Sequence, residues 1–152
     1  MTSKHLALLA GLGSIALMIG ALGFQYIGGM PPCKMCYWQR YPHIVAAVIL
    51  ALYWLIQQRV FLLLGALCAA VTSGIGAYHT GVERGWWKGP STCTSGSIDG
   101  LSTDDLLAQI MNAPLVRCDE VPWELFGLSM ASWNMVISAG LCALWLLAWK
   151  RA

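Results

Sequence analysis

The sequence predicts an all-α membrane protein, built as a bundle of four transmembrane helices. Hydrophobic residues make up 58% of the 152 residues and charged residues only 11%, whereas about a quarter of a typical soluble domain is charged. The hydrophobic residues also gather in four stretches, most of them close to the ~20 residues with which a helix crosses a hydrocarbon core of about 30 Å. These stretches are residues 6–26, 41–56, 60–78 and 128–149.

The rest of the sequence is too polar to form a second domain. The longest polar stretch, residues 79–127, has too few large apolar residues for a core of its own, so residues 1–152 are predicted to form one domain. The net charge is only +2, and no long run of Lys or Arg is present. The composition therefore does not indicate a protein that binds nucleic acid.

Residues 6–26 are predicted to form the first transmembrane helix. Lys4 precedes this stretch and Gly28 follows it, as in a cleaved signal peptide. However, the hydrophobic part of a signal peptide is about 7 to 15 residues long, and this stretch is longer and is followed almost at once by a second one. We therefore expect the stretch to be retained as a membrane span.

The second helix is predicted to begin near Cys36 and to span residues 36–56. Residues 41–56 alone would form a helix of about 24 Å at 1.5 Å per residue, which is shorter than the hydrocarbon core. An earlier start, just after the helix-breaking Pro31–Pro32, removes the shortfall. Cys36 would then lie at the N-terminal end of a helix, where the helix dipole and the unpaired N–H groups stabilise a thiolate.

Arg40 follows Cys36 by four residues and therefore lies one turn further along the same face of this helix. A cation at that depth is costly unless it reaches the interface or meets a partner. The position alone leaves two alternatives, an interfacial anchor or part of a functional site. Pro42, inside the same helix, is expected to remove one backbone hydrogen bond and to kink the helix.

Residues 60–78 and 128–149 complete the four spans, so both termini lie on one side of the membrane, together with the turn at residues 57–59. That side carries several cations and no acid; its cations are Lys4, Arg59, Lys150 and Arg151. All 7 acidic residues lie in the second outer loop, residues 79–127. By the positive-inside rule, the termini are predicted to be cytoplasmic, and the loops at residues 27–35 and 79–127 periplasmic.

The 6 cysteines fall into two groups. Cys68 and Cys142 lie within predicted spans, where a free cysteine usually serves as a small buried hydrophobic residue. The others lie in the outer loops; they are Cys33, Cys36, Cys93 and Cys118. Because disulfides form in an oxidising compartment, two structural disulfides are one interpretation of this second group.

The Cys-x-x-Cys spacing of Cys33 and Cys36 favours redox chemistry instead. Such a bridge closes a very short ring and adds little stability, whereas its two sulfurs exchange readily and the motif lowers the pKa of one thiol. Cys93 is flanked by small polar residues and is expected to be open to attack, while Cys118 is expected to lie nearer the membrane. Cys93 and Cys118 have poor ligand spacing for zinc, so no metal is predicted.

The second outer loop is predicted to contain a mobile segment and a short helix. Residues 91–97 are small and polar, which is typical of a mobile loop. Ser102 and Asp105 have the spacing of a capping box, and apolar residues follow at helical intervals. The apolar residues are Leu101, Leu106, Leu107, Ile110 and Met111. The helix is expected either to lie at the membrane surface or to pack against the loop itself.

The segment Cys33–Arg40, Cys-Lys-Met-Cys-Tyr-Trp-Gln-Arg, resembles the Cys-x-x-Cys-x-x-(Gln/Glu)-Arg signature of the DsbB family of bacterial inner-membrane proteins, which generate disulfides. The resemblance extends over the whole chain, because the four spans, a cysteine pair in each outer loop and the segment Phe126–Met130 also match. It implies that the protein takes electrons from a DsbA-type thioredoxin-fold oxidase in the periplasm. It also implies that a membrane quinone, ubiquinone or menaquinone, receives them.

The resemblance further implies roles for individual residues. Cys33 and Cys36 match the pair next to the quinone, with Cys36 as the thiolate that meets it. Arg40 matches the family's quinone-site arginine, which can stabilise a developing oxyanion. Cys93 and Cys118 match the pair that meets the partner protein, with Cys93 as the sulfur that the partner attacks. Electrons are therefore expected to pass from the second outer loop to the first.

His79, at the outer end of the third span, resembles a family histidine close to the quinone; the alternative is a polar residue of the membrane interface. Two alternative functions also remain open. An enzyme similar to vitamin K epoxide reductase has four spans and two cysteine pairs, but its Cys-x-x-Cys comes late in the chain, whereas here it comes first. A structural scaffold with inert disulfides would need neither Arg40 nor a quinone.

Overall fold

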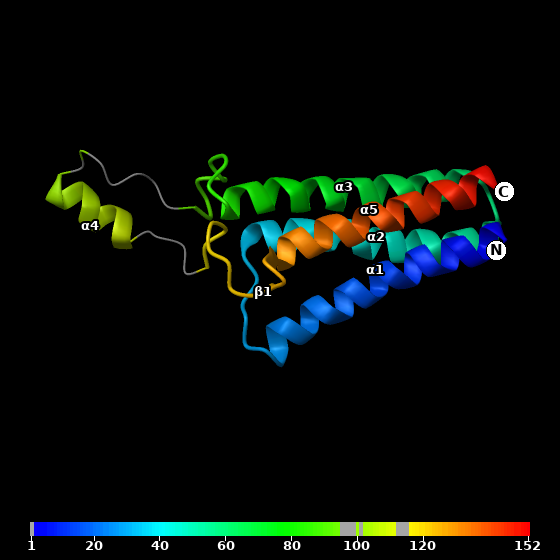
Figure 1. Cartoon of the computed structure of the whole chain (residues 1–152), viewed down its shortest axis with the longest axis horizontal. Helices are drawn as coiled ribbons and strands as arrows, with labels where there is room; N and C mark the ends of the chain where they lie inside the picture. Colours follow the sequence, from blue (N-terminus) through cyan, green and yellow to red (C-terminus); the bar gives the residue numbers. More distant parts are fainter. Residues whose placement is uncertain (1, 95–99, 101, 112–115) are drawn as a thin grey trace.

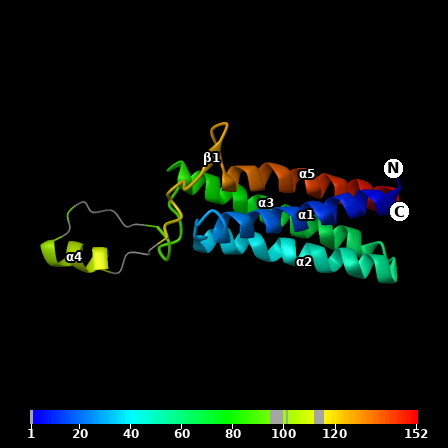
Figure 2. The ribbon, with the colours of Figure 1, turned by 90° about the horizontal axis from the view of Figure 1, so that it is seen from below.

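The computed structural model describes residues 2–94, 100, 102–111 and 116–152. Within them, four long helices run roughly along the long axis of the molecule, and both termini lie at the same end of the bundle (Figures 1 and 2). They are α1 (Ser3–Tyr26), α2 (Lys34–Ile56), α3 (Val60–Glu83) and α5 (Met130–Lys150). Each is long and apolar enough to cross a membrane. The predicted all-α membrane bundle is therefore confirmed.

α2 begins slightly earlier than the predicted start near Cys36. Its first residue is Lys34, and Cys33 is its N-cap: the Cys33 sulfur accepts a hydrogen bond from the Cys36 backbone N–H at 3.2 Å. The helix also continues through Pro42 to Ile56. Both cysteines of the Cys-x-x-Cys motif thus belong to the end of one helix.

α3 is longer than the predicted span, which ended at residue 78. The helix continues to Glu83, although the sequence becomes more polar there. The additional turn is stabilised by burial, because His79 and Val82 are each 3% exposed and Val82 packs into the cluster that contains the loop cysteines. His79 is therefore a residue of the helix and not of the loop that follows it.

The last span begins later than predicted, because residues 128–129 form a strand. β1 (Glu124–Leu125) and β2 (Leu128–Ser129) pair in an antiparallel hairpin. The two residues between them, Phe126 and Gly127, both have positive φ values, 54° and 72°, as a type I′ turn requires. Ser129 then caps α5 by accepting a hydrogen bond from the Ser132 N–H at 3.2 Å.

Close packing of α3 against α5 organises the bundle. The fully buried indole of Trp145 lies against Gly65, where an added Cβ would come within 2.6 Å of the ring. Towards the other end of α3, a Cβ added at Gly76 would lie 3.0 Å from the Ala131 carbonyl oxygen. Small residues at these positions allow the close helix approach that is typical of membrane bundles.

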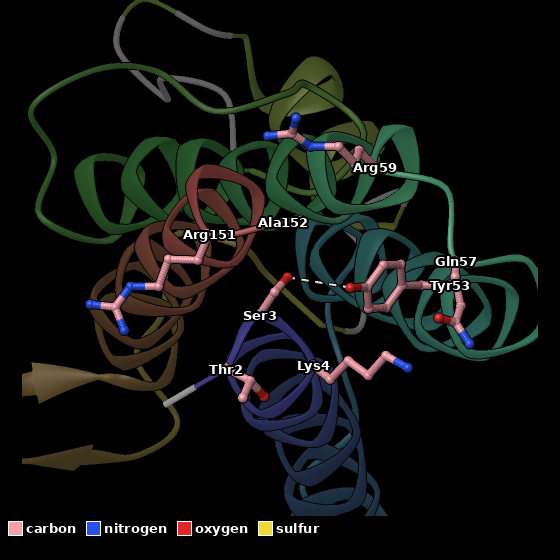
Figure 3. A pocket seen from close by; sticks show the side chains of 8 residues that line it. All are labelled: Thr2, Ser3, Lys4, Tyr53, Gln57, Arg59, Arg151 and Ala152. Atoms are coloured by element: carbon pink, nitrogen blue, oxygen red, sulfur yellow. Dashed lines mark hydrogen bonds between the residues drawn. The ribbon is translucent and has the colours of Figure 1, made fainter.

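A pocket of about 460 Å³ lies at the end of the bundle that holds both termini (Figure 3). Within it, the Ser3 and Tyr53 hydroxyls lie 3.3 Å apart, and Arg59 donates a hydrogen bond to the Trp149 carbonyl at 2.9 Å. The lining residues are Thr2, Ser3, Lys4, Tyr53, Gln57, Arg59, Arg151 and Ala152. The loops that carry the cysteine pairs lie at the opposite end of the bundle, so this pocket is not part of their site.

The second outer loop contains the predicted short helix, α4 (Thr103–Met111). The Ser102 hydroxyl accepts a hydrogen bond from the Asp105 N–H at 3.2 Å and donates one to the Asp105 carboxylate at 2.6 Å. Ser102 therefore caps the helix, as its spacing from Asp105 predicts.

One of the two predicted positions had the apolar face of α4 packed against the loop, and within the described part of the chain three of its apolar side chains are not covered. α4 stands beyond the end of the bundle in Figure 1, and Leu107, Ile110 and Met111 are exposed. The other position, at the membrane surface, stays a prediction. Leu101 and residues 95–97, which belonged to the predicted apolar stripe and the predicted mobile segment, lie outside the described residues.

Candidate active site

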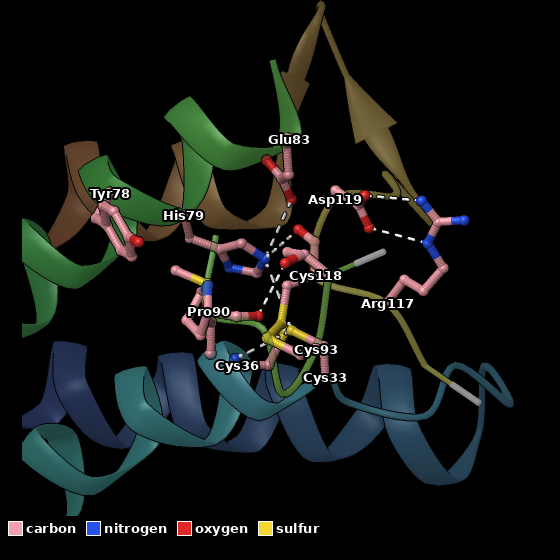
Figure 4. Close-up of a disulfide and its surroundings, with 12 residues drawn as sticks. Cys33, Cys36, Tyr78, His79, Glu83, Pro90, Cys93, Arg117, Cys118 and Asp119 are labelled. Carbon is pink, nitrogen blue, oxygen red and sulfur yellow. Dashed lines mark hydrogen bonds and ion pairs between the residues drawn. A yellow bond between two sulfur atoms is a disulfide. The ribbon is translucent and has the colours of Figure 1, made fainter. Parts of the chain in front are cut away.

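Four cysteines meet at the end of the bundle where α2 begins and α3 ends (Figure 4). Cys93 and Cys118 form a disulfide, with their Cα atoms 5.3 Å apart. Cys33 and Cys36 are free thiols whose sulfurs lie 2.9 Å apart. One buried hydrophobic cluster contains Cys33, Cys93 and Cys118, and Cys36 packs against it. The fold thus brings the cysteines of the two outer loops together.

The predicted accessibility of Cys93 is wrong for this structure, since Cys93 is 1% exposed. The chain turns back over the sulfur: the Cys93 N–H donates to the Pro90 carbonyl at 3.0 Å, and the Cys93 carbonyl accepts from the Cys118 N–H at 2.6 Å. Another protein's thiolate can attack a disulfide only when it reaches a sulfur. In this conformation of the loop, the Cys93 sulfur is therefore not accessible to another protein.

The thiols of the first pair, Cys33 and Cys36, are not equivalent. The Cys33 thiol donates a hydrogen bond to the Cys36 sulfur at 2.9 Å. This hydrogen bond, together with burial, raises the pKa of Cys33 far above its usual range. Cys33 therefore holds its proton tightly, while Cys36 presents a half-buried sulfur that accepts a hydrogen bond. Cys36 is thus the more accessible sulfur of the pair.

His79 lies between the two pairs. Its Nε2 atom is 3.2 Å from the Cys118 carbonyl oxygen and 3.6 Å from the Cys33 sulfur. Its Nδ1 atom is 2.9 Å from the side-chain amide nitrogen of Gln39. The ring is 3% exposed, which disfavours the alternative of a polar residue at the membrane interface. A contact between His79 and a quinone stays a prediction.

Arg40 binds groups on the neighbouring helix α1. Its guanidinium donates hydrogen bonds to Gln25 Oε1 at 2.5 Å and to the Ala21 carbonyl at 3.2 Å, and it lies 5.3 Å from the centroid of the Tyr37 ring. These contacts anchor α2 to α1. The guanidinium of Arg40, one turn from Cys36 and beside the 41% exposed Tyr37, also fits a flat conjugated ring whose oxygens accept hydrogen bonds.

The first pair and His79 form the one arrangement of potential metal ligands found among the described residues. The ligand atoms of Cys33, Cys36 and His79 lie within 4.8 Å of one another, and thiolates and imidazoles are typical zinc ligands. The spacing of the cysteines along the chain did not indicate this combination, because His79 comes from a different helix. His79 Nε2 already contacts the Cys118 carbonyl, so binding a metal ion there would break that contact.

Comparison with known families agrees with the geometry of the site. Residues 3–148 match the family model described as "Disulfide bond formation protein DsbB". The chain belongs to the DsbB family. This membership favours the DsbB function over one similar to vitamin K epoxide reductase, and it makes the chain a multi-pass membrane protein of bacterial disulfide bond formation.

Relatives of this DsbB family member, each named Disulfide bond formation protein B, match over most of its length. The protein from Polaromonas naphthalenivorans (strain CJ2) is 29% identical over 95% of this chain and 91% of its own. That from Albidiferax ferrireducens is 30% identical over 92% and 84%. That from Verminephrobacter eiseniae is 30% identical over 97% and 87%. No solved structure matches the chain significantly.

Glu83 and Asn134 of this DsbB site were not singled out from the sequence, and Gln39 appeared there only as the Gln of the family signature. The Glu83 side chain is 4% exposed, lies 3.8 Å from His79 Nε2 and accepts a hydrogen bond from the Ser129 hydroxyl. Glu83 follows His79 by four residues, so its position on the same helix face could have been predicted from the sequence. Gln39 and Asn134, which are bonded to each other at 2.8 Å, come from different helices. No local pattern could have paired them, because only the packing of both α2 and α5 against α3 brings them together.

Proposed function

We propose that this DsbB family member reoxidises a periplasmic DsbA-type dithiol oxidase and passes two electrons to a membrane quinone. The electrons would pass through Cys93 and Cys118 and then through Cys33 and Cys36. The observation that carries the proposal is the single buried cluster that holds both pairs, one as a disulfide and one as thiols. An inert scaffold would need neither a free Cys-x-x-Cys pair nor two pairs in contact.

In the first exchange, a thiolate of the partner attacks the Cys93 sulfur. The Cys93–Cys118 bond breaks, and Cys118 leaves as a thiolate. When the partner's second thiolate displaces Cys93, the partner acquires a disulfide and this chain acquires two electrons and two protons. The burial of Cys93 requires that docking of the partner opens the loop first.

In the second exchange, the Cys118 thiolate attacks Cys33 of a Cys33–Cys36 disulfide, and Cys36 leaves as a thiolate. Cys93 then displaces Cys33 from Cys118. These steps restore the Cys93–Cys118 disulfide and leave Cys33 and Cys36 reduced, ready to pass two electrons on.

Cys36 and Arg40 are the residues proposed to hold the quinone, with His79 as a third contact. A bound quinone would supply an acceptor for the two electrons and two protons of the dithiol. Cys36 presents its sulfur at the N-terminal end of α2, where the helix dipole favours negative charge. Arg40 holds a fixed positive charge one turn away, which can stabilise negative charge on an oxygen.

The purified protein should reduce a soluble ubiquinone or menaquinone analogue only when a reduced DsbA-type partner is supplied, as measured by the loss of quinone absorbance. Cys36→Ser should abolish this reaction, because no thiolate remains next to the acceptor. Cys142→Ala, which changes a cysteine of α5 outside the site, should keep the wild-type rate. Quinone reduction by Cys36→Ser at the wild-type rate would refute the proposal.

The proposed relay also needs both cysteine pairs in the periplasm and both termini in the cytoplasm. A membrane-impermeant thiol reagent added to reduced spheroplasts should therefore label Cys33, Cys36, Cys93 and Cys118, as counted by mass spectrometry. A Gln58→Cys change in the opposite turn is the matched control and should be labelled only after the membrane is opened. The reverse pattern would contradict the orientation and with it the proposed partner.

A further inference from the structure

A chain of buried polar side chains leads from the cysteines into the bundle. It links α3, α2 and α5 through hydrogen bonds, and most of its members are less than a tenth exposed. Its members are His79, Gln39, Asn134, His43, Thr72 and Ser138. Polar groups inside membrane spans are costly, and they commonly mark functional positions. The proposed relay gives no role to Gln39 or Asn134.

The contacts of Gln39 determine which way its amide points. The amide nitrogen lies 3.3 Å from the Met35 carbonyl oxygen, which can only accept a hydrogen bond. On the other side, Gln39 Oε1 accepts from the Asn134 amide nitrogen at 2.8 Å. The Gln39 nitrogen must therefore also be the group that faces His79 Nδ1 at 2.9 Å, and it donates to that atom.

Asn134 is held in turn by groups on α2, α3 and α5. Its amide nitrogen lies 3.1 Å from the Thr72 hydroxyl, whose own hydrogen goes to the Gln39 carbonyl at 2.9 Å. Its Oδ1 accepts from His43 Nε2 at 2.9 Å and from the Ser138 hydroxyl at 3.3 Å. Rotating the Asn134 amide would place its oxygen against Gln39 Oε1 and the Thr72 hydroxyl oxygen, neither of which has a hydrogen left to donate, so its orientation is determined as well.

These orientations determine where His79 carries its proton. Nδ1 accepts from Gln39, so in the neutral ring the hydrogen must be on Nε2. The Cys118 carbonyl, which can only accept, requires the same hydrogen on Nε2 at 3.2 Å. His79 therefore donates towards the cysteines. In this arrangement its Nε2 atom cannot take the proton of Cys33, although the two atoms lie 3.6 Å apart.

We propose that Gln39, held by Asn134, is a positioning residue that keeps His79 as an Nε2–H donor. His79 in that form binds the Cys118 backbone and holds the second cysteine pair next to Cys33, which favours exchange between the pairs because proximity speeds the step. The kinetic part of this inference rests on the proposed function. The position of the proton on His79 does not, and it can be measured separately.

The proton position is measured by NMR of protein labelled with ¹⁵N-histidine, since the chain has only 3 histidines and His79→Ala assigns the site. Wild-type His79 should show a protonated Nε2 and an unprotonated Nδ1. In Gln39→Glu the carboxylate can only accept, so Nδ1 should become protonated. Asn134→Ala leaves Gln39 in place but removes the hydrogen bond that holds its Oε1. A mixture of the Nδ1–H and Nε2–H forms of His79 is then expected. A protonated Nδ1 in the wild type, or an unchanged ring in Gln39→Glu, would overturn the inference.

The kinetic consequence is measured by rapid mixing with a reduced DsbA-type partner, followed by acid quench and alkylation of free thiols. Gln39→Met should slow electron transfer from the second pair to the first by roughly 3- to 10-fold, the effect of one lost hydrogen bond, and leave the first exchange with the partner unchanged. Ser73→Ala removes a different, partly buried hydrogen bond between α3 and α5, to the Met135 carbonyl, and should slow neither step.

Equal slowing in Ser73→Ala and Gln39→Met would show a general loss of bundle packing and would overturn the positioning role. An unchanged transfer rate in Gln39→Met would overturn it too. If the wild type itself did not oxidise the partner, the proposed function would fail, while the proton position on His79 would still stand or fall by the NMR measurement alone.

Discussion

Cys118→Ala, incubated under a mild thiol oxidant with a DsbA-type partner that lacks its second active-site cysteine, should accumulate as a covalent adduct with the partner through Cys93. The added oxidant takes up the two electrons that are released when the two thiols form a disulfide. Cys118 is the sulfur placed to leave, because its backbone is bound on both sides: its N–H donates to the Cys93 carbonyl and its carbonyl contacts His79. With the leaving sulfur and the resolving thiol both absent, nothing can displace the adduct. Non-reducing gels and peptide mapping should place the bond at Cys93.

Cys93→Ala with Cys118 retained is the reciprocal variant, and it should trap almost no adduct. Both loop cysteines are buried, but the Cys118 carbonyl is bound to His79 of α3, whereas the backbone of Cys93 is bound only within the second outer loop, to Pro90 and Cys118, among the described contacts. Opening that loop should therefore expose Cys93 before Cys118. An adduct that maps chiefly to Cys118 would reverse the order of the two loop cysteines. The adduct with Cys93 should also disappear on reduction, which distinguishes it from nonspecific crosslinking.

Arg40→Ala should raise the apparent KM for quinone by roughly 10- to 100-fold, the range expected for the loss of a charged hydrogen-bond donor. The first exchange with the partner should be unchanged, because Arg40 has its described contacts on α1 and α2 and none with the second outer loop. Steady-state rates at varied quinone concentration give the KM, and stopped-flow mixing with the partner gives the first exchange.

The anchoring contacts of Arg40 require a matched variant. Gln25→Leu removes its shortest described contact, the 2.5 Å hydrogen bond to Gln25 Oε1, and leaves the guanidinium in place. If Arg40 acts on quinone, Gln25→Leu should change the KM for quinone much less than Arg40→Ala does. Equal effects of the two variants, or a KM unchanged in both, would assign Arg40 to anchoring α2 on α1.

The four spans could be predicted because a membrane helix carries its signal in the sequence itself, as a long apolar stretch. The ends of those helices were harder to predict, because contacts with neighbouring segments determine where each helix stops. Residues after Tyr78 look polar, yet α3 continues to Glu83 since the loops bury this last turn. Leu128 looks like the start of a span, yet the positive φ values of Phe126 and Gly127 place it in a hairpin.

The site likewise contains residues that local sequence patterns identify and others that only the packed fold brings together. Cys33 and Cys36 could be singled out from the sequence, because the Cys-x-x-Cys spacing and the family signature are both local patterns. The accessibility of Cys93 was predicted wrongly, because small polar neighbours suggest exposure, whereas Cys93 packs into a buried cluster with Met35 and Val82. Asn134 is far from the cysteines in sequence, and only the packed bundle brings it to Gln39.

The N-cap of α2 is itself a reacting atom. In most helices the capping group is chemically inert, but here the Cys33 sulfur both accepts the Cys36 N–H and, in the proposed relay, changes its bonding partner during each cycle. Any difference in cap strength between the oxidised and reduced pair therefore contributes to the reduction potential. Since a cap contributes about 1 kcal/mol and 30 mV corresponds to about 1.4 kcal/mol, the contribution is on the order of 20 mV. By thermodynamic reciprocity, a ligand that tightens the first turn of α2 also shifts the redox equilibrium of the pair.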